Sequence, residues 1–168
     1  LTRAQVEKHV EKSLERLQTD RIDLYQTHKD DPATPVDETL EALDRLVKAG
    51  KVRAIGASQY EPARLRESLV ASKRMGIPGY QTLQPEYNLY DRAGYEKTLA
   101  PVCLEKGLGV IPYFSLGSGF LTGKYRSEKD LAGRARAGFV KKYLNERGFR
   151  ILDALDRGHE RRARGRHG

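Results

Sequence analysis

The feature that most constrains this chain is a regular alternation of short apolar runs with helical stripes. Apolar runs at residues 22–28, 52–57, 80–83 and 108–111 predict four strands. The stripes between them, at 36–47, 62–75 and 95–106, each end near a glycine and predict helices. Strands joined through single helices pair in parallel, since the crossover brings the chain back to the same starting edge. The sequence therefore predicts an α/β fold with a parallel sheet.

One more helix is expected before the first strand. Thr2 and Gln5 have the spacing of a capping box. Apolar residues then recur at helical spacing and form one stripe made of Val6, Val10, Leu14 and Leu17. Up to residue 111, the sequence thus predicts a helix, three strand–helix units and a fourth strand.

The number of strands distinguishes between two α/β architectures. No GxGxxG sequence follows any predicted strand, which argues against a Rossmann domain. A complete (β/α)8 barrel takes about 250 residues, whereas this chain has 168. We therefore predict a partial (β/α)8 TIM barrel with about four parallel strands, over residues 1–156.

The pattern changes after the fourth predicted strand. Residues 113–125 are expected to form a glycine-containing loop, and 131–138 an irregular basic segment. A helical stripe resumes over 139–156, with an interruption predicted at Gly148. Residues 157–168 have no periodicity, and we expect a disordered Arg/Gly-rich tail there. We interpret this ending as that of a truncated or frame-shifted chain.

Charge and cysteine content narrow the choice of partners. Residues 1–123 carry 17 basic and 17 acidic residues, so the net charge of +8 comes from the last quarter. No RNA- or DNA-binding motif accompanies this basic region, and we expect a solvated surface there and no nucleic acid partner.

No apolar run reaches 18 residues, so no membrane span is expected. The single cysteine, Cys103, favours a reducing, cytoplasmic setting.

Polar and aromatic residues follow each predicted strand directly. In an α/β barrel the functional residues lie at the carboxyl ends of the strands. The four segments found there, Thr27–Asp30, Ala57–Tyr60, Gln84–Asn88 and Pro112–Ser115, together predict the rim of a site for a flat polar ligand.

Four of these motifs together resemble the aldo/keto reductase family. They are IDLYQTH at 22–28, VKAGKVRAIGAS at 47–58, LQPEYNL at 83–89 and VIPYFSLGSGFLTGKY at 110–125. They occur in the family's order and spacing, and the resemblance covers residues 1–156. It implies a C-terminal-half fragment of the barrel of an NADP(H)-dependent oxidoreductase that reduces aldehydes and ketones to alcohols.

The resemblance also implies roles for residues of the first three strand ends. His28 would hydrogen-bond the substrate carbonyl and polarise it for hydride attack. Ser58 and Gln84 would hold the nicotinamide carboxamide. Gln59 stands where the family usually has Asn, so its longer side chain puts the amide contact at this position in question.

The fourth motif would hold other parts of the cofactor. Tyr113 would stack on the nicotinamide ring. The segment after it would face the pyrophosphate, with glycine backbone and a lysine charge suited to phosphate. Its predicted cofactor residues are Ser115, Leu116, Gly119 and Lys124.

The catalytic set implied by the resemblance is incomplete in this chain. The family uses Asp, Tyr, Lys and His, and only the histidine motif is present; the tyrosine is the proton donor. We therefore expect the chain alone to be inactive, since a positioned proton donor typically raises the reaction rate about 10²–10⁴-fold. Self-association through exposed barrel edges is one expectation. The alternative function is a non-catalytic, aldo/keto reductase-like binding or assembly subunit.

Overall fold

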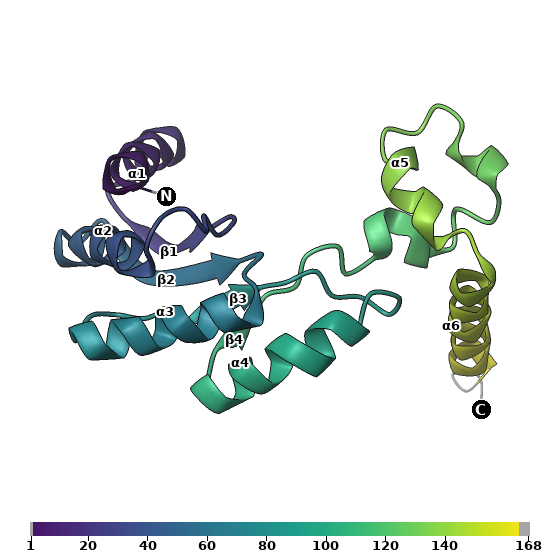
Figure 1. The fold of residues 1–168 in the computed structure, drawn as a ribbon. Helices are drawn as coiled ribbons and strands as arrows, with labels where there is room; N and C mark the ends of the chain where they lie inside the picture. Colours follow the sequence, from purple (N-terminus) through teal and green to yellow (C-terminus); the bar gives the residue numbers. More distant parts are fainter. Residues whose placement is uncertain (1, 165–168) are drawn as a thin grey trace. The chain divides into compact units, whose positions relative to one another are not determined.

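The computed structural model describes residues 2–164 and contains two compact units (Figure 1). The first, which we call the strand unit, comprises the chain up to Pro85 together with Gly94–Ile111. The second, the helical unit, comprises Glu86–Ala93 and the chain from Pro112 onward. Each unit is described by itself.

The strand unit alternates helices and strands as the sequence predicts. Its four strands form one parallel sheet in the order β1-β2-β3-β4, which confirms the partial α/β barrel. The elements follow the chain as α1 (Arg3–Leu17), β1 (Ile22–Thr27), α2 (Val36–Lys48), β2 (Val52–Ser58), α3 (Pro62–Met75), β3 (Thr82–Gln84), η1 (Tyr95–Leu99), α4 (Ala100–Lys106) and β4 (Gly109–Val110).

Local signals in the sequence explain where these helices begin and end. The Thr2 backbone N–H donates to Gln5 Oε1 at 2.9 Å, completing the predicted capping box. Gly76 and Gly107 end α3 and α4 with φ of 65° and 66°, a left-handed conformation that glycine adopts without steric cost. The predicted inward position of Leu17 is wrong: its side chain is 63% exposed at the last turn of α1.

The last helix of the strand unit differs from the regular helix expected over 95–106. Residues Tyr95–Leu99 form a π-helical turn before α4 continues in ordinary geometry. Pro101 has no N–H to donate to the carbonyl of Lys97, four residues earlier. The wider π turn is a common way to accommodate such a lost bond.

The core of the strand unit lies between the sheet and its helices. Tyr25, Ile55 and Leu83 alternate with the opposite-face residues of their strands and belong to one hydrophobic cluster with the buried stripes of α1 and α2. The helices therefore cover this face of the sheet. The opposite face carries Gln26, Gly56 and Thr82, which are paired in one row across β1, β2 and β3.

The helical unit contains short helical turns followed by one long helix. They are η2 (Gly117–Thr122), η3 (Glu128–Leu131), α5 (Ala137–Val140), η4 (Lys141–Tyr143) and α6 (Glu146–Arg164). The predicted break at Gly148 is wrong, because the helix is interrupted at residues 144–145 instead. There Asn145 Oδ1 accepts from the Gly148 N–H at 3.0 Å and so caps the first turn of α6.

The basic tail also differs from its prediction. Residues 157–164 continue α6, where the sequence predicts disorder. Arginine, glutamate and alanine have good helix propensity and make up most of these residues, which extend a helix whose earlier turns are packed through Leu152. Residues 165–168 lie outside the described part of the chain.

The small core of the helical unit is built around Tyr143. Its ring stacks on Phe120 with centroids 5.3 Å apart, and its hydroxyl donates to Asp91 at 2.7 Å. Lys142 pairs with the same Asp91 carboxylate at 3.0 Å. Burial and the neighbouring Asp91 charge raise the pKa of Tyr143 to about 12. A buried tyrosine and a half-buried ion pair thus join the 86–93 segment to η4.

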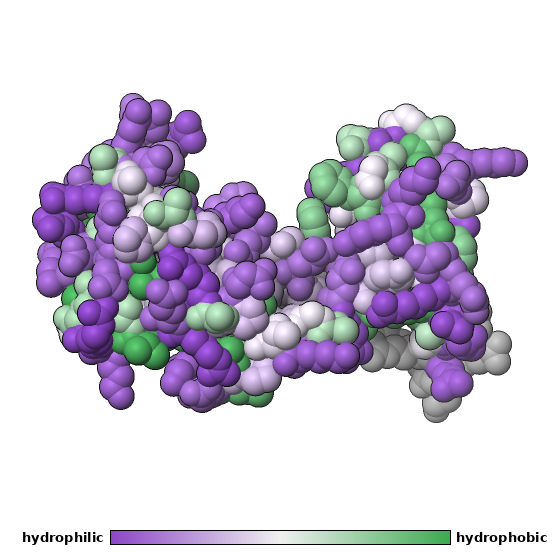
Figure 2. Space-filling view, viewed as in Figure 1, coloured by the Kyte–Doolittle hydropathy of each residue, from purple (hydrophilic) through white to green (hydrophobic). Residues whose placement is uncertain are grey.

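The visible faces of both units are largely hydrophilic (Figure 2). Within residues 2–164, no helix combines the length and apolar character needed to cross a bilayer.

Candidate active site

The carboxyl ends of β1, β2 and β3 meet at one edge of the sheet, where the sequence predicts functional residues. Ser58 and Gln84 are paired across β2 and β3 at this edge. The buried Ser58 hydroxyl donates to the Gln84 carbonyl oxygen at 2.9 Å. Parallel register thus brings together two of the residues that were predicted to hold an amide ligand.

His28 and Gln59 lie at the same edge, one residue beyond β1 and β2. Both side chains are exposed, and Gln59 Nε2 donates to the His28 carbonyl oxygen at 3.0 Å. Gln59 has a φ of 52°, in the left-handed region that non-glycine residues rarely adopt. Its side-chain N–H therefore ties the two strand ends together, while its amide oxygen is not used in this bond.

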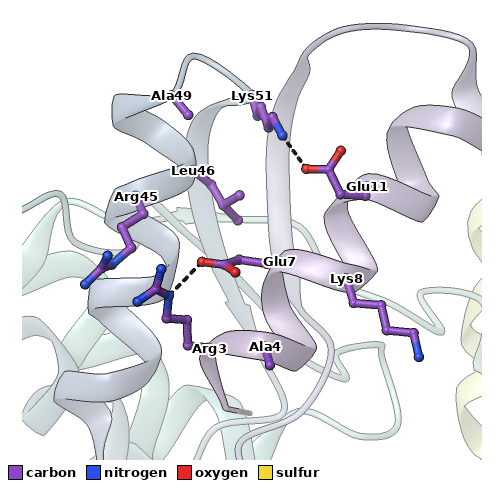
Figure 3. A pocket seen from close by; sticks show the side chains of 9 residues that line it. All are labelled: Arg3, Ala4, Glu7, Lys8, Glu11, Arg45, Leu46, Ala49 and Lys51. Atoms are coloured by element: carbon purple, nitrogen blue, oxygen red, sulfur yellow. Dashed lines mark hydrogen bonds and ion pairs between the residues drawn. The ribbon is translucent and has the colours of Figure 1, made fainter.

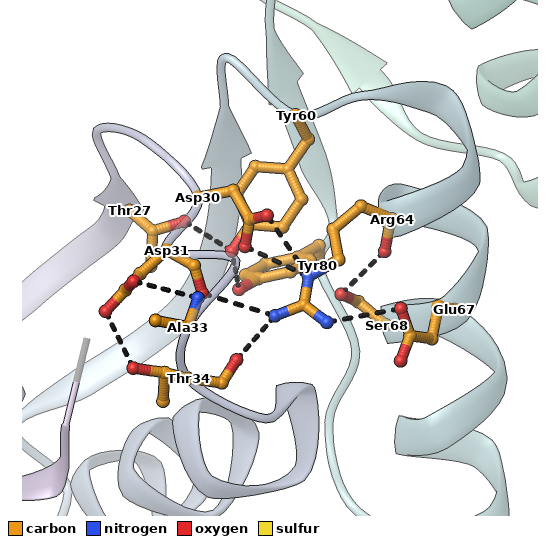
Figure 4. Close-up of polar contacts among 10 residues, drawn as sticks. All are labelled: Thr27, Asp30, Asp31, Ala33, Thr34, Tyr60, Arg64, Glu67, Ser68 and Tyr80. Carbon is orange, nitrogen blue, oxygen red and sulfur yellow. Dashed lines mark hydrogen bonds and ion pairs between the residues drawn. The ribbon is translucent and has the colours of Figure 1, made fainter.

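A polar network that the sequence did not predict supports the loop that follows His28 (Figure 4). Arg64 of α3 forms two hydrogen bonds, of 3.1 and 3.2 Å, with the Asp30 carboxylate. It also donates to the backbone carbonyls of Asp31 and Thr34. The Arg64 and Asp30 side chains are only 18% and 15% exposed. One guanidinium thus holds the β1–α2 loop at several points.

Two buried tyrosines lie behind this network. The Tyr60 and Tyr80 hydroxyls are 2.8 Å apart, and Thr27 donates to Tyr60 at 3.5 Å. Burial raises the pKa of both tyrosines, so both stay neutral near pH 7. Nearly complete burial separates them from the exposed His28. We therefore assign them to the support of the strand ends, and not to proton donation.

The remaining predicted residues belong to the helical unit. Tyr113 is half-buried, its carbonyl accepts from the Tyr87 N–H at 3.3 Å, and its ring contacts Phe114 edge-on at 5.2 Å. Burial, followed by the nearby Glu86 charge, raises the pKa of Tyr113. Phe114 has a φ of 53°, and its carbonyl accepts from Asn88 at 3.2 Å. Such strain in a bulky residue is typical of positions fixed for function.

Within the predicted pyrophosphate segment, Gly117–Thr122 form the 3-10 turn η2. The Gly119 N–H donates to the Leu116 carbonyl at 3.0 Å, so this amide is already paired within the turn. Gly119 has a φ of 96°, and a Cβ there would meet Lys124 Cε at 3.0 Å. Ser115, Leu116 and Lys124 are exposed. A phosphate would find the Lys124 charge here, but not the Gly119 amide.

A groove of about 610 Å³ runs between α1 and the C-terminal part of α2 (Figure 3). Two of its acidic residues are paired with basic ones, Glu7 with Arg3 and Glu11 with Lys51. None of the strand-end residues lines this groove. Within residues 2–164, no cluster of three or more His, Cys, Asp or Glu side chains is arranged to hold a metal.

Comparisons with known proteins identify the family of this half-barrel. The model of the aldo/keto reductase family matches residues 1–162. The aldo-keto reductase YhdN of Bacillus subtilis is 36% identical over 92% of this chain and 44% of its own length. The L-glyceraldehyde 3-phosphate reductase of Escherichia coli is 31% identical over 88% of this chain and 44% of its own length. The chain belongs to the aldo/keto reductase family.

Another relative is named for a different role. A probable voltage-gated potassium channel subunit beta of Oryza sativa is 34% identical over 74% of this chain and 38% of its own length. The chain spans less than half the length of the curated relatives named here. Similarity to these proteins thus supports an oxidoreductase of this family in general terms.

Proposed function

We propose that this chain provides the nicotinamide half-site of an NADP(H)-dependent aldo/keto reductase. The observation that carries the proposal is the edge formed by His28, Ser58, Gln59 and Gln84. Ser58 and Gln84 end paired parallel strands, and His28 and Gln59 each follow a strand end by one residue. In this family the reaction is the reversible reduction of an aldehyde or ketone to an alcohol.

The polar groups at this edge fit a carboxamide. An amide ligand offers one carbonyl acceptor and two N–H donors, and Ser58, Gln59 and Gln84 contain complementary hydroxyl and amide groups. Gln59 is the longer homologue of the usual Asn, and its N–H is bound to the His28 carbonyl at 3.0 Å. We therefore assign the principal contacts to Ser58 and Gln84, with the Gln59 oxygen as an accessory acceptor.

His28 is proposed to contact the substrate. The bound dihydronicotinamide supplies the hydride in such a reaction. The exposed His28 imidazole would donate a hydrogen bond to the carbonyl oxygen and stabilise the negative charge that develops there. The loop after His28 is held by Arg64, which limits the movement of the backbone from which the imidazole projects.

Residues of the helical unit are proposed to complete the cofactor contacts. Tyr113 would stack on the nicotinamide, with Ser115, Leu116 and Lys124 facing the pyrophosphate. Gly119 would contribute close approach of the backbone and not a hydrogen bond, because its N–H is bound to the Leu116 carbonyl. Lys124 lies 5.1 Å above the Tyr125 ring, so its charge is directed over a neighbouring aromatic residue before any ligand binds.

The chain alone is proposed to bind cofactor without turning over. The Asp, Tyr and Lys motifs of the family's catalytic set are not found in its sequence, so the proton that completes carbonyl reduction has no assigned donor. The test is an assay of carbonyl-dependent NADPH oxidation by the purified 168-residue chain. We expect no turnover, and sustained oxidation would refute this part of the proposal.

A non-catalytic assembly subunit is the second candidate function. It is favoured by the similarity to the probable potassium channel subunit beta of Oryza sativa. A stable hetero-complex that forms equally with and without NADPH would favour this role. Self-association through the β1 and β4 edges, checked by sedimentation, is a related proposal. We also propose a cytoplasmic location, in keeping with the unpaired, buried Cys103.

A further inference from the structure

The face of the sheet opposite the helices of the strand unit contains a polar row beside the candidate carboxamide site. Gln26 of β1, Gly56 of β2 and Thr82 of β3 are paired in register. Gln84 follows Thr82 by two residues and so projects from the same face, one step closer to the strand ends. This row therefore lies directly next to the Ser58–Gln84 pair.

The glycine in the row allows side chains of β1 and β3 to meet. A Cβ on Gly56 would lie 2.9 Å from Gln26 Cγ and would overlap the Thr82 hydroxyl. Because Gly56 has no side chain, Gln26 crosses over β2 and reaches β3. The crossing needs a residue with no side chain between the two.

Hydrogen bonds along the row give the Gln26 amide a defined orientation. The Thr82 hydroxyl donates to Gln26 Oε1 at 3.2 Å, and Gln26 Nε2 donates to Gln84 Oε1 at 3.3 Å. Gln84 Oε1 thus faces Gln26, and the Nε2 of Gln84 is directed away from Gln26. Reversing the Gln84 amide would bring two NH₂ groups against each other and lose this bond.

We propose that Gln26 is a positioning residue that fixes the amide orientation of Gln84, so that Gln84 offers an N–H donor to the carbonyl oxygen of the nicotinamide carboxamide. This inference rests on the proposed function, because it assigns Gln84 a ligand. Thr82 contributes by fixing Gln26 in turn. Gln26 itself acts through Gln84 and needs no contact with the cofactor.

The informative substitution is Gln26→Glu at pH 8. A carboxylate accepts hydrogen bonds but donates none, so Gln84 would turn its NH₂ toward residue 26 and present its oxygen to the ligand. Gln26→Met removes both functions and leaves Gln84 free to turn. Gln81→Glu adds the same charge at an exposed position just before β3 and serves as the matched control.

The first readout needs no cofactor. In the ¹⁵N-labelled wild-type chain we expect the Gln26 NH₂ protons to be protected from solvent exchange and the Gln84 NH₂ protons to exchange freely. In the Gln26→Glu variant the Gln84 NH₂ protons should become protected. Protected Gln84 protons in the wild type, or unchanged exchange in the variant, would overturn the inference. Backbone spectra that match the wild type establish that each variant is folded.

The second readout compares NADP⁺ with its 3-acetylpyridine analogue, which keeps the carbonyl oxygen but lacks the amide NH₂. One hydrogen bond corresponds to a factor of about 10 in binding. We expect Gln26→Glu to weaken the analogue about tenfold more than NADP⁺, and Gln81→Glu to leave the ratio unchanged. An unchanged ratio in Gln26→Glu would refute the positioning role. A wild-type chain that binds neither nucleotide would refute the proposed function, whereas the exchange data would still decide whether Gln26 orients Gln84.

Discussion

Replacing Gly148 with alanine adds one methyl group where α6 begins beside the turn η2. The new Cβ would overlap the backbone carbonyl oxygen of Tyr143 and lie 3.0 Å from Phe120 Cζ. A carbonyl cannot rotate away as a side chain can, so the backbone must shift. Overpacking of this kind typically costs about 1–3 kcal/mol, whereas helix propensity favours alanine by about 1 kcal/mol. The difference leads us to expect that Gly148→Ala lowers the free energy of unfolding by about 1 kcal/mol.

Gly158 provides the matched control in the same helix. A Cβ at Gly158 would meet no atom within 4 Å, so Gly158→Ala should stabilise α6 by up to about 1 kcal/mol through propensity alone. Urea unfolding followed by circular dichroism and tyrosine fluorescence would measure both variants. A Gly148→Ala protein as stable as the wild type, or a destabilised Gly158→Ala protein, would refute the packing described for the helical unit.

Three further predictions follow from the polar contacts and from the row of side chains on the sheet. Arg64→Ala should lower the free energy of unfolding, measured in urea, by about 2–4 kcal/mol because it leaves partly buried partners unpaired. The substitution Arg66→Ala, at an exposed position, should lower it by less than about 1 kcal/mol. Equal losses in the two variants would contradict this prediction. Burial acts to raise the pKa of Asp91, but hydrogen bonds from its neighbours outweigh it and lower the pKa below 3.8. Its contribution to stability should therefore be present above about pH 4 and lost below it, and Asp91→Asn should remove this part of the pH dependence measured by thermal unfolding. Gly56→Ala should displace Gln26 and lower the free energy of unfolding by about 1–3 kcal/mol. Unchanged NMR signals of the Gln26 side chain would contradict the proposal that Gln26 reaches over β2 to β3.

Periodicity and glycine positions were enough to predict the strand unit. Capping residues and helix-ending glycines set the bounds of α1 and α3 within a residue or two, since these signals act over one turn. Leu17 is a position where apolar periodicity does not predict burial. It continues the stripe, but α1 ends there before a partner surface can cover it.

The helical unit and the supporting network were less predictable. The break before α6 depends on the Asn145 cap and on the close approach at Gly148, which are set by tertiary packing. Arg64 and Asp30 are 34 residues apart, and no local pattern links them. Gln26 was in principle detectable, because a polar residue inside an apolar strand needs a buried partner or a ligand.

The measurement that most directly tests the nicotinamide half-site is a fluorescence titration of the folded 168-residue chain with NADPH. We expect saturable binding that Gln84→Met weakens about tenfold or more, whereas Gln81→Met, at an exposed position, leaves it unchanged. Equal binding by the Gln84→Met variant, or no binding by a chain shown to be folded by circular dichroism, would show that these strand ends do not form a nicotinamide half-site.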